Sequence, residues 1–151
     1  NDKPLVSIIV TTFNEEKNIE NCLISISNQT YENIESIVVD NNSLDRTKEI
    51  SLKYTKKVYN KGPERSAQRN YGMIEKSSGY YVMFVDADMI LAPYLIESCV
   101  HHMTTNSDIA LHINEIILGV NYFSKVRRFE RSFYNGTVID GARFFIKKNF
   151  K

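Results

Sequence analysis

The sequence predicts one α/β domain whose mostly parallel sheet is flanked by helices. A chain of 151 residues is about one domain long, and its 42% hydrophobic and 25% charged fractions are ordinary for a globular protein. Apolar, β-branched segments alternate along the chain with segments whose apolar residues recur at helical spacing. This β-α-β-α-β-α-β order favours parallel strands joined by right-handed crossovers.

The first strand is expected at residues 5–12, LVSIIVTT, which are apolar and β-branched almost throughout. That composition is typical of a strand buried on both faces. Ile19, Leu23 and Ile26 follow at helical spacing and predict the first helix. Residues 34–40, IESIVVD, then predict the second strand.

The second helix is expected to begin at Ser43, because serine suits the N-cap position. Asp45 then falls in the first turn, where the helix dipole favours an acid. A short third strand is expected at residues 56–60, KKVYN.

The third helix is predicted from Ala67, Tyr71 and Ile74, which form an apolar stripe at positions i, i+4 and i+7. Gly79 is expected to end this segment. Residues 80–86, YYVMFVD, are apolar or aromatic up to the final acid and predict the fourth strand.

The remaining elements have weaker patterns. Pro93 is expected to open a helix, because proline suits the first helical position. A strand is expected at 108–113, a helix near 122–134 and a last strand at 137–146.

Composition excludes several classes of function. The net charge of +1 argues against a general nucleic-acid binder. Cys22 and Cys99 stand in no C-x-x-C pattern, which is typical of a reduced, cytosolic chain. No apolar run approaches the roughly 18 residues that span a bilayer, and the N-terminal NDKPLVS lacks the character of a signal peptide. A cytoplasmic location is therefore expected.

Polar segments follow three of the predicted strands: TTFNEE at 11–16, DNNS at 40–43 and DADM at 86–89. In open α/β sheets, ligands bind at the carboxyl ends of the strands. The first two of these segments are not glycine-rich, so the signatures of a dinucleotide fingerprint and of a P-loop are both absent. A nucleotide bound here needs another way to hold its phosphates.

The acid pair Asp86 and Asp88 suggests one way. Residues i and i+2 of an extended backbone point to the same side. A hard divalent cation between the two carboxylates, Mg²⁺ or Mn²⁺, would bridge them to a diphosphate. The alternative is a solvated strand end with acids in a turn, since an isolated D-x-D is common by chance.

The context of this pair resembles a known family. VSIIVTTFNEE, VVDNNSLDRT, RSAQRNYGM and GYYVMFVDADM occur in the order and spacing of nucleotide-sugar glycosyltransferases of the GT-A fold. The closest resemblance is to the large inverting family, often called family 2, that makes polysaccharides and glycolipids. It extends over residues 4–105, and TVIDGARFFIKKNF is similar more loosely. The resemblance implies a donor-binding half at residues 1–105 and the start of an acceptor-side half at 106–151.

The resemblance implies a nucleotide-base site around Phe13. In the family an aromatic at this position packs near the base, between the positions of Thr11 and of Asn14 and Glu15. Stacking of a base on an aromatic ring contributes roughly 1–3 kcal/mol. Plain core packing is the alternative for Phe13.

Asp40 matches a family acid that accepts a hydrogen bond from the ring N–H of the base. Uracil, thymine and guanine carry that donor, so a UDP-, dTDP- or GDP-sugar is implied, and UDP is the commonest in the family. Asn41 departs from the frequent Asp-Asp pair. Because an amide can donate as well as accept, the identity of the base stays open.

Further roles are implied near the diphosphate. Arg65 and Arg69 lie at i and i+4 on one helical face and match basic residues near the donor phosphates. Lys61, just upstream, suits either that role or a solvated basic face. Asp88 matches the metal ligand, and Asp86 matches the acid that contacts ribose or sugar and helps to hold the metal.

The implied reaction is metal-dependent transfer of a sugar, with inversion, to a hydroxyl of a glycan or lipid-linked acceptor. The family's catalytic base is expected beyond Lys151, so the chain is expected to be a C-terminally truncated piece that transfers sugar poorly. Asp140 is the nearest substitute for the base, although it more plausibly contacts a sugar.

Alternatives of other classes stay open. One is a non-catalytic module that binds a nucleotide-sugar. The predicted helix at 122–134 is basic and amphipathic, which suits peripheral contact with the cytoplasmic face of a membrane or a core helix with a solvated face. A receiver-like domain is disfavoured, because its acid pair would follow the first strand.

Overall fold

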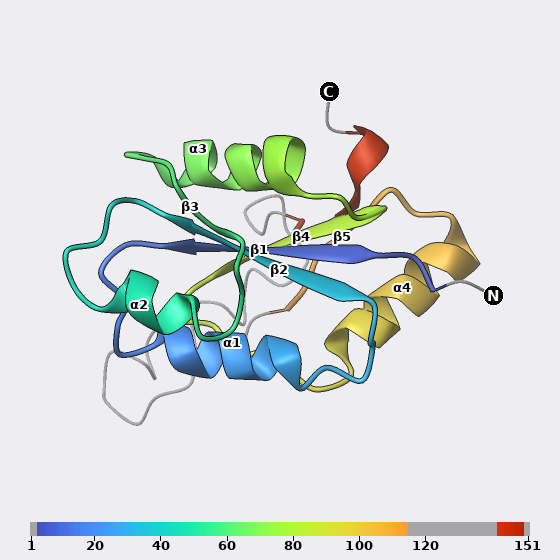
Figure 1. Cartoon of the computed structure of the whole chain (residues 1–151). Coiled ribbons are helices and arrows are strands. Elements are labelled where there is room, and N and C mark those ends of the chain that lie inside the picture. Colours follow the sequence, from blue (N-terminus) through green and yellow to red (C-terminus); the bar gives the residue numbers. More distant parts are fainter. Residues whose placement is uncertain (1–2, 115–141, 150–151) are drawn as a thin grey trace, which may run out of the picture.

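The structure, a computed structural model, describes residues 3–114 and 142–149 (Figure 1). Within these residues one sheet has the strand order β3-β2-β1-β4-β6-β5. Its strands are β1 (Val6–Thr12), β2 (Ile34–Asp40), β3 (Val58–Asn60), β4 (Tyr81–Asp86), β5 (Ala110–Leu111) and β6 (Phe144–Ile146). The first four run parallel, whereas β6 pairs antiparallel with both β4 and β5. The predicted mostly parallel sheet is confirmed.

Helices cover both faces of this sheet. They are α1 (Ile19–Ser27), α2 (Thr47–Ser51), α3 (Arg65–Asn70), the π-helix η1 (Tyr71–Lys76), α4 (Leu95–Asn106) and the 3₁₀ turn η2 (Lys147–Asn149). Figure 1 shows α3 on one side of the strands and α1 and α2 on the other. Among the described residues, none of the helices has both the length and the apolar character needed to cross a bilayer.

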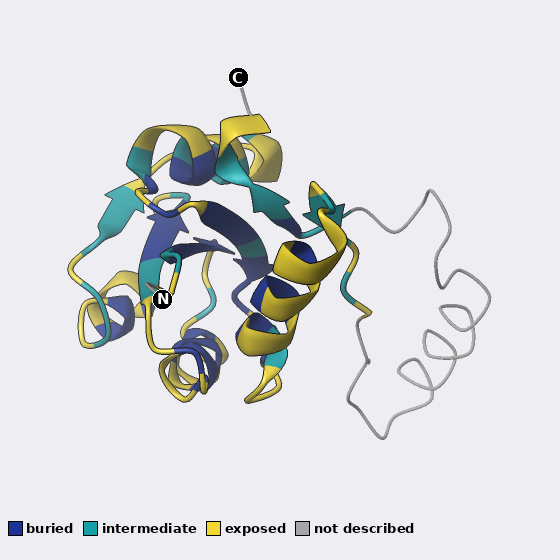
Figure 2. Cartoon of the chain, turned by 90° about the vertical axis from the view of Figure 1, so that its right-hand side faces the viewer, coloured by how far each residue is buried: buried dark blue, intermediate teal, exposed yellow. Residues whose placement is uncertain are grey.

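Two apolar cores lie on the two faces of the sheet, and β1 contributes to both. Val6, Ile8 and Val10 pack in the cluster that includes the buried side chains of α1 and α4. Ile9, between them, packs with Met73 of η1 on the opposite face. All seven residues of β1 are buried, as predicted from their composition. Figure 2 shows the helices turning their buried residues inward and their exposed residues outward.

The predicted start of the second helix is wrong. Helix α2 begins at Thr47, and Ser43 lies in the preceding loop. The Ser43 hydroxyl donates to the carboxylate of Asp40 instead of capping a helix, because that acid is three residues away at the end of β2. Asp45 accepts a hydrogen bond from the Thr47 N–H at 3.0 Å. Asp45 therefore lies two residues before the helix, not in its first turn as predicted, and stabilises the helix start from there.

The predicted apolar stripe of the third helix is also wrong. Ile74 leaves 47% of its surface exposed, and Ala67 and Tyr71 are only partly buried. The helix changes from α to π geometry at Tyr71, and the wider π turn shifts which side chains face the sheet. This segment ends at Lys76 rather than at Gly79.

The residues of this segment that do face the sheet are Gln68, Gly72 and Met73. Gly72 permits the close approach of η1, since a Cβ atom there would lie 2.5 Å from the Ile9 Cγ2 atom. Such a distance is far inside van der Waals contact, so a side chain at this position would push η1 off the sheet.

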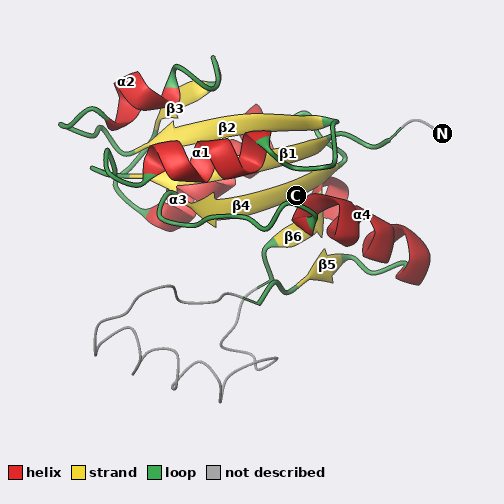
Figure 3. Cartoon of the chain, turned by 90° about the horizontal axis from the view of Figure 1, so that it is seen from below, coloured by secondary structure: helices red, strands yellow, loops and turns green. Residues whose placement is uncertain are grey.

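The C-terminal elements follow the sequence expectations in part. Helix α4 begins at Leu95, two residues after Pro93. The strand expected at 108–113 is present as the two residues of β5, and the one expected at 137–146 as the three residues of β6. Figure 3 shows β5 and β6 beside α4 at the edge of the sheet. The predicted helix at 122–134 lies outside the described residues.

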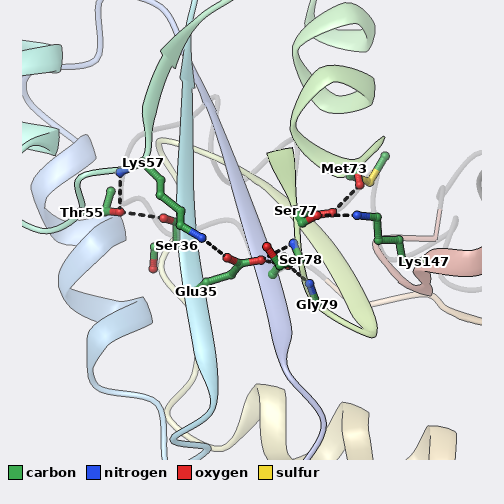
Figure 4. Close-up of polar contacts among 10 residues, drawn as sticks. Glu35, Ser36, Thr55, Lys57, Met73, Ser77, Ser78, Gly79 and Lys147 are labelled. Atoms are coloured by element: carbon green, nitrogen blue, oxygen red, sulfur yellow. Dashed lines mark hydrogen bonds and ion pairs between the residues drawn. The ribbon is translucent and has the colours of Figure 1, made fainter. Parts of the chain in front are cut away.

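A polar network ties the strands together near the amino ends of β1 and β4 (Figure 4). Glu35 of β2 accepts hydrogen bonds from the Ser7 hydroxyl, from the Lys57 ammonium group and, at 2.6 Å, from the Ser78 N–H. Ser7 also accepts from the Gly79 N–H at 2.8 Å. Burial alone would raise the Glu35 pKa, but these hydrogen bonds outweigh it and lower the pKa below its usual range.

We expect Glu35→Gln to lower the free energy of unfolding at pH 7 by about 1–3 kcal/mol, because neighbouring donors lose a charged acceptor. A carboxylate with a lowered folded-state pKa stabilises the fold above its unfolded-state pKa, and the stabilisation disappears as pH falls through the folded-state value. The difference between wild type and variant should therefore shrink from pH 7 towards pH 3. Urea unfolding across this range measures it, and a difference that stays constant with pH would contradict the assignment.

Candidate functional site

The carboxyl ends of four parallel strands meet at one edge of the sheet. In the register of the ladder, Thr12 of β1 lies opposite Asp40 of β2, which lies opposite Asn60 of β3. On the other side of β1, Thr11 lies opposite Asp86 of β4. The three polar segments that the sequence placed after strands are thus brought together along this edge.

Asp86 ends β4 with a largely buried carboxylate surrounded by cations. Its Oδ1 atom accepts from the Thr11 hydroxyl at 3.0 Å and from Arg69 Nη2 at 3.1 Å. Two more guanidinium groups lie 3.8 Å from Oδ2, those of Arg65 and Arg143. Three arginines from α3 and from the segment before β6 therefore converge on one acid.

The arginines determine the ionisation of Asp86. Burial would raise the Asp86 pKa, but the hydrogen bond and charge of Arg69, the Thr11 hydroxyl and the charge of Arg143 outweigh it and lower the pKa. The Arg69 and Arg143 guanidinium groups also lie 4.2 and 5.2 Å from the centre of the Phe84 ring. Cation–π contact with this one ring helps to hold two like charges near the same carboxylate.

Asp88 lies in a different setting from Asp86. Strand β4 ends at Asp86, and Asp88 is exposed in a turn in which the Met89 N–H donates to the Asp86 carbonyl oxygen at 3.0 Å. The extended backbone that would direct both acids to one side therefore stops between them. Among residues 3–114 and 142–149, no group of three or more His, Cys, Asp and Glu side chains is arranged to hold a metal ion.

Cys22 of α1 packs directly beneath this turn. Its thiol donates to the Asp86 carbonyl oxygen, with the sulfur 3.8 Å away. Burial, followed by the charges of Asp88 and Asp86, raises the pKa of this thiol to about 12. The sulfur therefore stays protonated, and a nucleophilic role for Cys22 at this site is disfavoured.

Asp40 closes β2 with only 1% of its surface exposed. Its Oδ2 atom accepts from the Ser43 N–H at 2.8 Å, and its Oδ1 atom accepts from the Ser43 hydroxyl. The next residue, Asn41, donates from Nδ2 to the Pro63 carbonyl oxygen at 3.0 Å. The acid expected to read the base is thus fixed in orientation by its own loop.

The loop after β1 is joined to the loop after β2. Asn14 adopts a left-handed backbone with φ of 52°, which asparagine tolerates. Its N–H donates to the Ser43 hydroxyl at 2.8 Å, and the Glu15 N–H donates to the Thr47 hydroxyl at 2.8 Å. Phe13 leaves 53% of its surface exposed, so the alternative of plain core packing does not hold for this ring.

Two residues at this edge of the sheet were not predicted from the sequence. Gln68 of α3 is 2% exposed, and its Nε2 atom donates to the carbonyl oxygens of Thr12 at 3.0 Å and Val39 at 2.8 Å. Arg143 reaches Asp86 from a part of the chain that the sequence assigned to the acceptor side. No local pattern marks either residue, since each acts through contacts with strands remote in sequence.

Lys61 and Asp140 complete the set of predicted residues. The Lys61 ammonium group lies 5.3 Å from the centre of the Tyr71 ring, and its phosphate role stays a prediction. Asp140 lies outside the described residues.

Comparison with known proteins gives one consistent family. The sequence model described as glycosyl transferase family 2 matches residues 7–149. An uncharacterised glycosyltransferase of Haemophilus influenzae is 34% identical over 122 residues, which are 74% of this chain and 47% of the relative. The putative glycosyltransferase EpsH of Bacillus subtilis is 31% identical over 73% of the chain and 33% of its own length. The chain thus spans about a third to a half of these relatives.

Solved structures share the fold. Staphylococcus aureus TarS in complex with UDP-GlcNAc matches with a TM-score of 0.65 and 29% identity, over 78% of this chain and 36% of that one. A mannosyltransferase of Pyrobaculum calidifontis, in complex with GDP-Man and Mn²⁺, matches with a TM-score of 0.67 and 24% identity, over 76% and 36%. The expected GT-A type of α/β fold is thereby confirmed.

Proposed function

Because the chain belongs to glycosyl transferase family 2, we propose that it binds a nucleoside diphosphate sugar for transfer, with inversion, to a hydroxyl of a glycan or lipid-linked acceptor. The observation that carries the proposal is the carboxyl edge of the sheet, where Asp40, Asp86 and three arginines gather around the strand ends. Ligands of open α/β sheets bind at this edge.

A uracil base is the proposed occupant of the edge near β2. Phe13 offers an exposed aromatic face for stacking. The Asp40 carboxylate, with acceptor positions beyond those that Ser43 uses, suits the ring N–H of the base. The relative TarS is described in complex with UDP-GlcNAc, which supports UDP as the nucleotide.

Mn²⁺ or Mg²⁺ is the proposed cofactor, with Asp88 as the protein ligand. An exposed carboxylate fits such an ion, because Mg²⁺ is commonly held by one or two carboxylates together with substrate phosphates. Asp86 fits less well, since its oxygens face Thr11 and guanidinium groups. A bound ion would supply Lewis-acid neutralisation of the charge on the diphosphate.

The residues of the chain itself contribute charge and orientation. Arg65 and Arg69 would pair with phosphate oxygens as the sugar bond breaks, which stabilises the leaving nucleoside diphosphate. The acceptor hydroxyl needs a carboxylate to take its proton. Asp140 and an acid beyond Lys151 stay proposals for that base, and lipid contact through 122–134 stays a prediction.

Base selectivity tests the proposal. Calorimetry with UDP, CDP and ADP, each with Mn²⁺, should give roughly tenfold or tighter affinity for UDP, because cytosine and adenine lack the ring N–H that Asp40 would accept. Asp40→Asn should reduce that preference. Asp108→Asn, which removes a carboxylate after the end of α4, is the matched control and should retain it. Equal affinity for the three nucleotides in the wild-type protein would contradict the proposed base site.

A further inference from the structure

Two lysines and two tyrosines form a cluster where η1 faces β3. The Lys76 ammonium group lies 4.9 Å from the centre of the Tyr71 ring and 5.1 Å from the centre of the Tyr59 ring. The Lys61 ammonium group lies 5.3 Å from the centre of the same Tyr71 ring. The two rings meet edge to face, with their centres 6.2 Å apart. We call these four residues the lysine–tyrosine strip.

The positive charges of the strip are not neutralised by acids. Within residues 3–114 and 142–149, neither Lys61 nor Lys76 forms an ion pair with a carboxylate, although Glu64 and Glu75 lie close to them in the sequence. A hydrogen bond with Tyr71 raises the pKa of Lys76, so this ammonium group stays charged at neutral pH. Contact with an aromatic ring orients an ammonium group but leaves its charge in place. The strip therefore carries two positive charges, which favour an anionic ligand.

The strip starts at the carboxyl edge of the sheet. Lys61 directly follows β3, and its N–H donates to the Asp40 carbonyl oxygen at 2.9 Å. Helices α3 and η1 follow one another without a break, from Arg65 beside Asp86 to Lys76. At about 1.5 Å per residue this helical segment is roughly 15 Å long, and it connects the carboxyl end of β3 to the amino end of β4. The strip therefore leads away from the proposed donor site along the β3 edge of the sheet.

The side chains of the strip match the parts of an acidic sugar. Tyr59 and Tyr71 pack against the core with one part of each ring and leave another part accessible. The accessible part of an aromatic ring packs well against the C–H groups of a sugar ring. Each ammonium group has donors for a carboxylate or phosphate oxygen. An anionic membrane surface fits less well, because half-buried tyrosines cannot insert between lipids.

We propose that the lysine–tyrosine strip binds an acidic acceptor chain, a glycan whose sugars carry carboxylate or phosphate groups. The inference rests on the proposed function and deepens it, because it names the class of acceptor. One end of such a chain lies at the carboxyl edge of the sheet, where the donor sugar is transferred, and the sugars behind that end lie along β3 and η1. Lys61 and Lys76 pair with the acidic groups, and the two tyrosines support the sugar rings.

The test measures binding of a labelled oligogalacturonate, which has a carboxylate on every sugar, and of a neutral oligoglucose of the same length. The wild-type chain should bind the acidic probe at least about tenfold more tightly, and added salt should weaken this binding. Replacing both lysines of the strip, Lys61→Gln with Lys76→Gln, should weaken binding of the acidic probe about tenfold. The matched control, Lys53→Gln with Lys56→Gln, removes the same two charges from the connection between α2 and β3 and should leave this affinity unchanged. Thermal unfolding shows that both double variants are folded.

The outcomes separate this proposal from the proposed function. Equal affinity for the acidic and neutral probes, no measurable binding of either, or an equal loss in the two double variants would overturn the strip. Inorganic polyphosphate that binds the wild-type chain as tightly as the acidic probe would also overturn it, because a general polyanion surface needs no sugar ring. Binding of the acidic probe that depends on Lys61 and Lys76, together with no preference for UDP over CDP, would support the strip and count against the proposed base site.

Discussion

Asp88→Ala is expected to abolish the gain in affinity that Mn²⁺ gives to UDP binding, a loss of at least about tenfold. Asp88 is exposed in the turn after β4, where a carboxylate can reach both a cation and the phosphates beside it. Without this ligand a divalent cation would have to be held by the diphosphate and water alone. UDP affinity in the absence of metal should change little, because the arginines remain.

The contrast with Asp86→Ala makes this prediction specific. Removing Asp86 takes away the carboxylate that holds three guanidinium groups together, so UDP binding should weaken with or without Mn²⁺. Asp108→Ala, which removes an acid after the end of α4, is the control and should leave both affinities unchanged. Calorimetry with and without Mn²⁺ measures all three variants. An undiminished effect of Mn²⁺ in Asp88→Ala would show that the metal ligand lies elsewhere.

The two buried strands β1 and β2 were predicted from sequence more accurately than the helix termini and the short strands β5 and β6. The bounds of β2 match the expected 34–40, and β1 differs from 5–12 by one residue, because burial on both faces leaves a continuous apolar run. The start of α2 was misplaced since Ser43 has a competing partner in Asp40. The change to π geometry at Tyr71 has no signature in apolar spacing, which assumes one helical period throughout.

In the candidate site too, some residues could be predicted from the sequence and others could not. Residues at strand ends could be identified, because parallel strands bring consecutive carboxyl ends to one edge whatever the details of packing. Gln68 resembles any solvent-facing polar residue of a helix until its contacts with Thr12 and Val39 are seen. Arg143 lies beside Asp86 because β6 pairs antiparallel with β4, and the alternation of strands and helices in the sequence does not predict this pairing.

Gln68→Leu is expected to lower the free energy of unfolding by about 2 kcal/mol or more. The Gln68 amide is buried, and it links the carbonyl oxygens of β1 and β2 where the two strands end. Leucine has a similar size but no donor, so buried carbonyl groups lose a hydrogen bond without gaining water. Each lost hydrogen bond contributes about 0.5–1.5 kcal/mol, and the Thr12 carbonyl oxygen keeps its bond from the Asn41 N–H at 2.9 Å.

The same substitution should also reduce binding at the carboxyl edge, because Gln68 connects the ends of the strands that carry Thr11 and Asp40. Urea unfolding measures the change in the free energy of unfolding. UDP calorimetry without urea, at a temperature well below the thermal unfolding midpoint, measures the change in affinity. Asn70→Leu, an exposed position two residues along, is the matched control for adding an apolar side chain. If Gln68→Leu and Asn70→Leu unfold at the same urea concentration, the amide bridge contributes little, and strand pairing alone positions Thr11 and Asp40.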